Sequence, residues 1–166
     1  MLLFSKFSLN LESKENPAMF ARSEGFVRVT CLTDLAFPPE RHSFNSPALD
    51  LLSPIGFMLA PRSRRWIQMD LEVQAPPGCY IRLTSINFYA RAFGLEVGSG
   101  VVEPNTSNLG VLLYNHSEEK VPIRRGQPIA HMICEQYKYV TMVHTARDGE
   151  SWSYDNLRTG NPYRLL

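Results

Sequence analysis

The sequence predicts an all-β fold, either a jelly roll or a distorted β-barrel. Short apolar stretches alternate with turn residues from Phe26 onward, and a helical period is almost absent. The 12 prolines and 10 glycines of the 166-residue chain interrupt it too often for long helices. In residues 67–73, apolar side chains alternate strictly with polar ones, which is typical of a strand with one buried and one solvent-facing side.

Turn signals bound the strands expected in the first half of the chain. Pro38 and Pro39 end the first of them, and prolines lie on both sides of the second. The run 76–78, Pro-Pro-Gly, makes a turn before the fourth, because proline fixes φ and glycine accepts a positive φ. These strands are expected at 26–32, 46–54, 67–73 and 79–83.

In the second half, a polar tip at 103–108 separates two apolar stretches, as in a β-hairpin. The run 126–128, Gly-Gln-Pro, opens the next strand. Only residues 88–93 have the pattern of a helical turn. Strands are expected at 95–102, 110–114, 129–134 and 137–144.

The length fits one domain, since about 150 residues per domain is typical. Residues 1–25 lack periodicity and are predicted to be a leader or arm, residues 26–146 the β-barrel domain, and residues 147–166 a C-terminal arm. In that arm, Trp152, Tyr154 and Tyr163 are the aromatic side chains best suited to anchor it on a neighbouring subunit or partner.

Charge and cysteine content limit the possible partners and compartments. The 17 basic and 16 acidic residues give a net charge of +1, which excludes a strongly basic nucleic-acid module, so no nucleic-acid partner is expected. The three cysteines lack metal-ligand spacing and favour a reducing compartment, the cytoplasm or nucleus. The apolar start is too short for a signal peptide or spanning helix, so no membrane insertion is expected.

From residue 46 to 134, the order of motifs resembles the trimeric dUTPase family. The matching runs follow the family's order and approximate spacing, and several in register are hard to obtain by chance. They are Ala-Leu-Asp-Leu at 48–51, Pro-Pro-Gly-Cys-Tyr-Ile-Arg at 76–82, Val-Gly-Ser-Gly-Val-Val-Glu at 97–103, Gly-Val-Leu-Leu-Tyr-Asn at 110–115 and Arg-Gly-Gln-Pro-Ile-Ala-His-Met-Ile at 125–133.

This resemblance implies a jelly roll that assembles as a homotrimer, with active sites shared between subunits. Family enzymes hydrolyse dUTP to dUMP and pyrophosphate. An aspartate of the third motif activates the attacking water. Arginine, serine and glutamine side chains neutralise the triphosphate, and Mg²⁺ bridges its oxygens.

The first two motifs differ in how well they match. Asp50 matches the first-motif aspartate, and the alternative interpretation is a turn cap beside Ser53. At the second motif, Ile86 stands where the family has its phosphate-binding arginine, and Asn87 where it has serine. An isoleucine offers neither the charge nor the paired hydrogen bonds of a guanidinium.

The third and fourth motifs are also altered. Glu103 replaces the catalytic aspartate, and its longer side chain moves the carboxylate by about 1 Å, a shift that catalysis tolerates poorly. The tip around Asn105 is about one residue shorter and lacks the tyrosine that packs on the sugar. His131 replaces the fourth-motif glutamine, with a strand-end histidine as the plainer interpretation.

The remaining candidates lie outside these four motifs. The fifth motif survives only in the run 158–163, which begins with Arg158 but has lost most of its glycines. The run 61–63, Pro-Arg-Ser, has the residues of the second motif but precedes the Pro-Pro-Gly turn, where the family order does not place that motif. Together with Arg64 and Arg65 it is interpreted as a solvated basic turn.

Because scaffold positions match while chemical positions do not, the sequence favours a catalytically inactive viral interaction module directed at host signalling proteins. It is similar to the adenoviral early-region-4 first-frame proteins over residues 112–128. In that case the chain needs no cofactor. One alternative is a divergent active dUTPase that uses Glu103 as base and Asp50 for Mg²⁺. Another is a nucleotide-binding sensor, with Asp50, Asn105 and Arg158 as contacts, or a structural assembly component.

Overall fold

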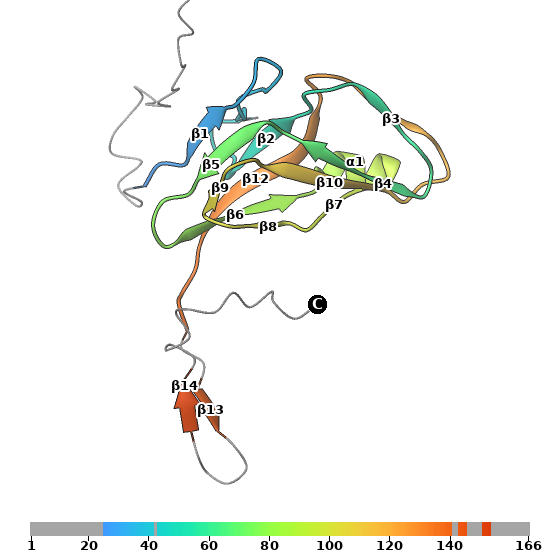
Figure 1. Ribbon diagram of the computed structural model, residues 1–166. Helices are drawn as coiled ribbons and strands as arrows, with labels where there is room; N and C mark the ends of the chain where they lie inside the picture. Colours follow the sequence, from blue (N-terminus) through green and yellow to red (C-terminus); the bar gives the residue numbers. More distant parts are fainter. Residues whose placement is uncertain (1–24, 42, 141–142, 146–150, 154–166) are drawn as a thin grey trace, which may run out of the picture. The chain divides into compact units, whose positions relative to one another are not determined.

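The computed structural model describes residues 25–41 and 43–140, and the backbone of two strands at 143–145 and 151–153. The chain divides into two compact units, residues 1–136 and 137–166, which are described separately. The first unit is a nearly all-β barrel with one short helix, as expected (Figure 1). The domain boundaries expected from the sequence stay a prediction.

The first unit is built from short strands that pair antiparallel. Its elements are β1 (Arg28–Cys31), β2 (Ala48–Leu52), β3 (Phe57–Leu59), β4 (Ser63–Gln68), β5 (Leu71–Gln74), β6 (Cys79–Thr84), α1 (Asn87–Phe93), β7 (Leu95–Gly98), β8 (Val101–Val102), β9 (Asn105–Thr106), β10 (Gly110–Asn115), β11 (Val121–Ile123) and β12 (Pro128–Gln136).

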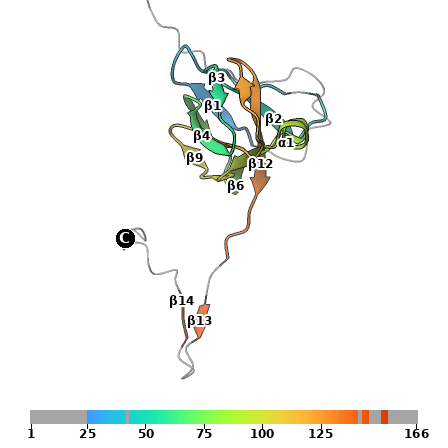
Figure 2. The same cartoon turned by 90° about the vertical axis from the view of Figure 1, so that its right-hand side faces the viewer.

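β12 lies at the centre of the largest sheet, whose strand order is β2-β12-β6-β8. The other sheets have the orders β4-β10-β7, β1-β5-β9 and β11-β3. Strands distant in the sequence therefore lie side by side, and together they surround a common interior, with α1 outside it (Figure 1 and Figure 2). This arrangement is consistent with the predicted jelly roll.

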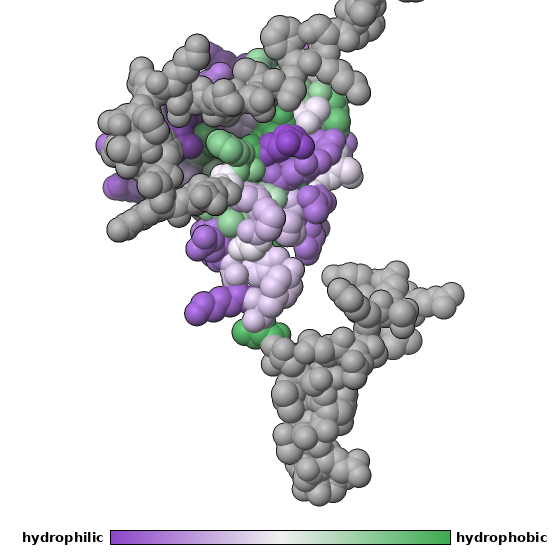
Figure 3. All heavy atoms as spheres, turned by 90° about the vertical axis from the view of Figure 1, so that its left-hand side faces the viewer, coloured by the Kyte–Doolittle hydropathy of each residue, from purple (hydrophilic) through white to green (hydrophobic). Residues whose placement is uncertain are grey.

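The interior is filled by apolar side chains from almost every strand. The residues that are least exposed come from β2, β4, β5, β6, β10 and β12, and they pack into one cluster. They include Leu51, Ile67, Leu71, Val73, Ile81, Val111, Leu113, Ala130 and Met132. Outside the interior, apolar and charged side chains are intermingled on the face seen in Figure 3.

The alternation at 67–73 correctly predicts which side chains are buried, but one continuous strand is wrong. Ile67, Met69, Leu71 and Val73 are all buried. Asp70 has a φ of 54°, so the chain turns there and passes from β4 in one sheet to β5 in another. The short side chain of aspartate tolerates this left-handed conformation, and it accepts a hydrogen bond from the Thr33 hydroxyl at 3.1 Å.

The expected hairpin around the tip at 103–108 forms only in its outer arms. β7 and β10 pair, with Leu95 opposite Asn115. The chain breaks at Ser99, whose φ is 52°, and β8 then pairs with β6. β9 pairs with β5 instead. The tip therefore connects two different sheets rather than closing one hairpin.

Trp66 lies flat against Gly110, and this contact requires glycine. A Cβ added to Gly110 would lie 1.9 Å from Cζ2 of the indole. The indole Nε1 donates to the side chain of Gln68 at 3.2 Å, and Trp66 is 54% exposed. The tryptophan therefore covers part of the barrel surface instead of entering the core.

In the second unit, residues 137–140 form no strand, so the strand expected at 137–144 is wrong there and is found only at its end, in β13. β13 (Val143–Thr145) is shorter and pairs with β14 (Ser151–Ser153), where His144 is opposite Trp152. β14 lies in the segment predicted to be an extended arm. No helix in the described ranges is long and apolar enough to cross a membrane.

Candidate functional site

Three adjacent strands bring two of the candidate site residues into one row. His131 on β12 is opposite Asp50 on β2 and, on its other side, opposite Thr84 on β6. Residues opposite each other in a sheet project from the same face. The first and fourth motifs thus meet at this row, and the second motif follows directly after Thr84.

Asp50 and His131 form a close pair. Asp50 Oδ1 lies 3.4 Å from His131 Nε2, and the side chains are 12% and 31% exposed. Asp50 also forms an isolated backbone bridge with Glu40, donating its N–H to the Glu40 carbonyl at 2.6 Å. The alternative in which Asp50 caps a turn is wrong, because it lies inside a strand. His131 likewise lies within β12, so it is not a strand-end histidine.

The second-motif segment forms the start of α1 and brings no charge to the site. The Ser85 hydroxyl accepts a hydrogen bond from the Val97 N–H at 2.9 Å and so holds the start of β7. Ile86 is the N-cap residue and makes no side-chain capping bond, and Asn87 is the exposed first residue of the helix. Ile86 and Asn87 therefore lie beside the row as expected, without a cation.

The helix α1 carries an aromatic cluster that the sequence reasoning missed, in which Phe88 is exposed and Tyr89 packs against the core. The rings of Phe88, Tyr89 and Phe93 lie 5.6 to 6.1 Å apart. Phe88 is 64% exposed, and α1 has no buried residue. The aromatic residues at i, i+1 and i+5 are the sequence pattern that could have indicated this cluster. The sequence alone predicts only a helical turn here.

Glu103 lies at the opposite end of β6 from the row. β8 is paired so that Val102 is opposite Ile81, and Glu103, the next residue, is level with Tyr80. Tyr80 and Thr84 are four residues apart, which is about 13 Å along a strand. One chain by itself therefore keeps Glu103 apart from Asp50 and His131.

Asn105 is in a different sheet from the strand that leads to Glu103. It pairs with Gln74 and is exposed. The Glu103 carbonyl accepts the Thr106 hydroxyl at 3.0 Å, and the Pro104 carbonyl accepts the Ala75 N–H at 2.7 Å. The tip is thus tied to β5 by its backbone, which leaves the carboxylate of Glu103 exposed to solvent.

Between Glu103 and the row, the same face carries a second cluster, formed by Tyr80, Arg82 and Glu135. The Tyr80 hydroxyl donates to Glu135 at 2.5 Å, and Arg82 Nε donates to the same carboxylate oxygen at 3.0 Å. The hydrogen bond from Tyr80, helped by Arg82, lowers the pKa of Glu135. Arg82 is therefore engaged and does not replace the phosphate-binding arginine missing at Ile86.

The cysteines do not form a reactive site. All three are free thiols. Burial raises the pKa of Cys134 to about 11, and the neighbouring Cys79 contributes to the shift. Burial also raises the pKa of Cys31. A high pKa disfavours the nucleophilic thiolate.

The other candidates lie in two places. Arg62 is in the turn before β4 and pairs with Glu118 at 2.5 Å, whereas Arg64 and Arg65 belong to β4. The prediction that all of them lie in one turn is therefore wrong. Arg158, Tyr154 and Tyr163 fall outside the described residues, and of Trp152 only the backbone is described.

Solved structures of dUTPases resemble the barrel, and this resemblance defines the class of fold. The dUTPase of phage phi11 of S. aureus aligns with a TM-score of 0.64 over 70% of this chain and 94% of that one, at 19% identity. The dUTPase of Staphylococcus bacteriophage 80alpha, solved with dUpNHpp, aligns with a TM-score of 0.65 over 70% and 86%, at 21% identity.

The chain belongs to the dUTPase family. The family model described as dUTPase matches residues 36–156. The deoxyuridine 5'-triphosphate nucleotidohydrolase of Mus musculus is 32% identical over 144 residues, which cover 85% of this chain and 87% of the mouse protein. The enzyme of the same name from Fowl adenovirus A serotype 1 is 35% identical over 127 residues, covering 76% of this chain and 70% of the viral one.

The family implies Mg²⁺, and the residues of the row offer few ligands for it. Among the side chains that the structure describes, no group of three or more His, Cys, Asp or Glu is placed to hold a metal. Mg²⁺ at triphosphate sites typically takes one or two carboxylates and completes its shell with phosphates and water. Asp50 supplies one such carboxylate, so the donor set fits Mg²⁺ that arrives with a triphosphate.

Proposed function

We propose that this protein hydrolyses dUTP to dUMP and pyrophosphate, slowly, at a site shared between copies of the chain. The main observation in support is that carboxylates occupy both acidic positions of the family motifs, Asp50 and Glu103. The named relatives support hydrolysis better than they support the inactive interaction module favoured by the sequence alone.

Each carboxylate has a distinct role in this proposal. Glu103, exposed on the tip, takes a proton from the water that attacks the α-phosphorus. Asp50, held on β2 beside His131, is the protein ligand for Mg²⁺. The metal, when bound, neutralises charge on the triphosphate oxygens.

The separation of the two carboxylates supports self-association. Within one chain Glu103 lies about 13 Å along β6 from the row that contains Asp50. A site that uses both therefore takes Glu103 from one copy and Asp50 from another. A closed homotrimer supplies three equivalent sites of this kind.

The substitutions explain why turnover is expected to be slow. Ile86 gives no positive charge where the family places a guanidinium, and Arg82 nearby is paired with Glu135. Charge-assisted, bidentate contacts to phosphate are among the strongest hydrogen bonds, so their loss weakens binding of the transition state.

A second candidate is a non-catalytic module that binds host signalling proteins. The aromatic cluster of Phe88, Tyr89 and Phe93 favours it, since exposed aromatic side chains are enriched at protein interfaces. The cluster lies directly after the position where the family binds phosphate. A nucleotide-binding sensor that uses Asp50 and Asn105 is the third candidate.

A pyrophosphate-release assay with dUTP and Mg²⁺ tests the proposal. Glu103→Gln is expected to abolish turnover, whereas the matched control Glu119→Gln, which changes another exposed carboxylate, leaves it intact. No turnover by the unmodified protein contradicts the proposal. Thermal stabilisation by dUTP in that case identifies the sensor, and no stabilisation favours the interaction module.

Mixing two inactive variants tests whether the site is shared. Asp50→Ala and Glu103→Ala are each expected to be inactive, but co-expression of the two regains part of the activity, because some sites then combine an intact Asp50 with an intact Glu103. Failure to regain activity, with both variants folded, contradicts a site formed between copies.

A further inference from the structure

Two arginine–phenylalanine pairs form around β3 and the loop that follows β11. The guanidinium carbon of Arg65 lies 4.3 Å from the ring centre of Phe57. That of Arg125 lies 4.4 Å from the ring centre of Phe37. Both distances are within the range of a cation–π contact.

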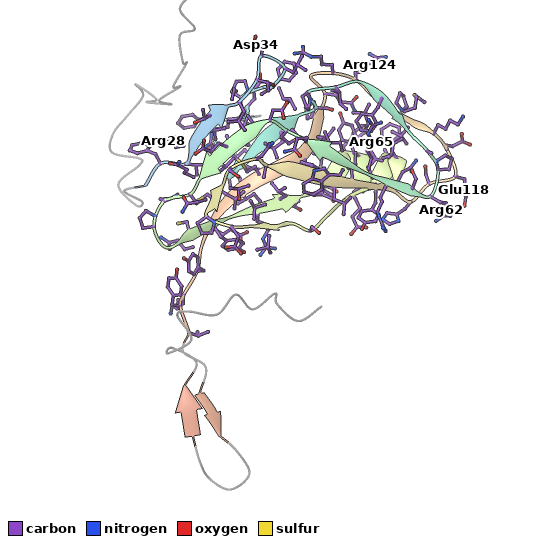
Figure 4. The ribbon with its side chains drawn as sticks, viewed as in Figure 1. Arg28, Asp34, Arg62, Arg65, Glu118 and Arg124 are labelled. Atoms are coloured by element: carbon purple, nitrogen blue, oxygen red, sulfur yellow. The ribbon has the colours of Figure 1, made fainter. Side chains whose placement is uncertain are left out.

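The two pairs are linked through β3 and β11. Phe57 on β3 is opposite Ile123 on β11, and Arg124 and Arg125 follow Ile123 directly. Gly56 lies beside Arg125, since a Cβ added to Gly56 would be in ordinary contact with the Arg125 nitrogen, at 3.6 Å. Figure 4 shows Arg65 on β4 and Arg124 on the loop that follows β11.

Exposed apolar side chains lie on the same segments as these pairs. Leu35 is 53% exposed, and its carbonyl accepts a hydrogen bond from Arg125 Nη2 at 3.4 Å. Ile55 and Met58, before and on β3, are 37% and 56% exposed. We call the set of Leu35, Phe37, Ile55, Phe57, Met58, Arg65, Arg124 and Arg125 the Arg–Phe surface.

The arginines of the Arg–Phe surface lack carboxylate partners within the described ranges. By contrast, Arg62 and Arg82 each pair with a glutamate. Asp34, in the turn before Leu35, forms no ion pair with the surface in the same ranges. These three arginines thus have no carboxylate that neutralises them within the described ranges, which leaves them available to an anionic partner.

We propose that the Arg–Phe surface binds an acidic peptide segment that carries apolar side chains. Carboxylates of the segment pair with Arg65, Arg124 and Arg125, and its apolar residues cover Leu35, Ile55 and Met58. Complementary charge of this kind gives an interface its orientation and specificity. The surface contains none of Asp50, Glu103 and His131, so peptide binding can be measured separately from dUTP hydrolysis, although Arg125 begins the family-matched run 125–133.

The apolar rim favours a peptide over nucleic acid. Single strands are bound by open aromatic faces and many cations along the backbone. Here each phenylalanine has one face occupied by an arginine, and the whole chain has a net charge of only +1. A peptide that alternates acidic and apolar residues matches both features of the surface.

Isothermal titration calorimetry with the full-length chain tests this proposal. The probe is a synthetic peptide in which glutamate alternates with leucine, and the control peptide has glutamine in place of glutamate. We expect saturable binding of the first, weakened by salt, and at least about tenfold weaker binding of the second. Equal binding of both peptides, or tighter binding of an oligothymidine of the same length, overturns the proposal.

Matched variants locate the binding. Arg124→Glu is expected to weaken peptide binding about tenfold or more while leaving the melting temperature unchanged, because this side chain is exposed and forms no ion pair or ring contact among the described residues. Arg91→Glu, on α1, makes the same change of charge elsewhere and is expected to leave binding unchanged. Equal losses in the two variants would place the binding elsewhere and overturn the proposal.

Discussion

The two faces of the sheet formed by β2, β12 and β6 carry opposite kinds of residue. On the inner face, Leu51 and Ile81 are completely buried in the apolar cluster. On the outer face, at the alternate positions of these strands, lie Asp50, His131 and the half-buried Thr84. Because neighbouring residues of a strand point to opposite faces, one step separates packing from chemistry. Substitutions on the outer face therefore alter the chemistry of the site and leave the packing of the barrel intact.

The largest expected effect comes from truncating the inner face. Leu51→Ala is expected to lower the free energy of unfolding by about 3 kcal/mol, because it removes buried apolar contacts and leaves a cavity. On the outer face, Thr84→Ala is expected to change it by less than about 0.5 kcal/mol. Urea denaturation of both variants measures the difference. Equal losses would show that the outer face also packs against something.

The next largest effect is expected from restoring a charge beside the row. Ile86→Arg returns the guanidinium of the family motif and is expected to raise kcat/KM for dUTP about 10²-fold, with little effect on stability. Ile86→Leu is the control and is expected to leave kcat/KM unchanged. An unchanged rate for the arginine variant would mean that a different step or group limits turnover.

The aromatic cluster of α1 is expected to behave as outer surface. Phe88→Ser is expected to change the free energy of unfolding by less than about 0.5 kcal/mol, because the side chain is 64% exposed. A substitution at the buried Leu95, Leu95→Ala, is expected to cost several times more. Thermal denaturation compares the two. A large loss in Phe88→Ser would show that the cluster is covered in the assembled protein.

The smallest expected effect concerns pH. Tyr80 and Arg82 lower the pKa of Glu135 from its ordinary value of 4.5 in the folded protein. Folding therefore gains stability from this group above pH 4.5, and the gain is lost as the pH falls through the lowered pKa. Urea titrations between pH 3 and 6 are expected to show a flatter pH dependence in Glu135→Gln. A dependence identical to that of the unmodified protein would place the acid sensitivity in other carboxylates.

The sequence predicted the strands of the central sheet well, because local signals define them. Prolines bound β2, and the turn before β6 has Gly78 at a φ of 75°, as expected. β12 begins after a Gly-Gln-Pro run. The break at Asp70 was not predictable from alternation, since Met69 and Leu71 are buried on either side of it and the pattern passes through the turn undisturbed.

The site was predictable in composition but not in arrangement. The motifs identified Asp50, His131 and Ile86. The register of β2 and β12 places Asp50 opposite His131, and Ile86 follows the end of β6. The distance of Glu103 from that row depends on the pairing of β8 with β6, and the Arg–Phe surface depends on that of β3 with β11. Such long-range registers leave no local pattern in the sequence.

The contact between Trp66 and Gly110 allows unfolding of the barrel to be followed by tryptophan fluorescence. The chain has two tryptophans, and the other, Trp152, belongs to the second unit. In a Trp152→Phe background, intrinsic emission would come from a single indole resting half exposed on β10. Unfolding of the barrel would remove that support and shift the emission towards that of a fully hydrated indole. The protein thus carries its own fluorophore for following the barrel apart from the C-terminal unit.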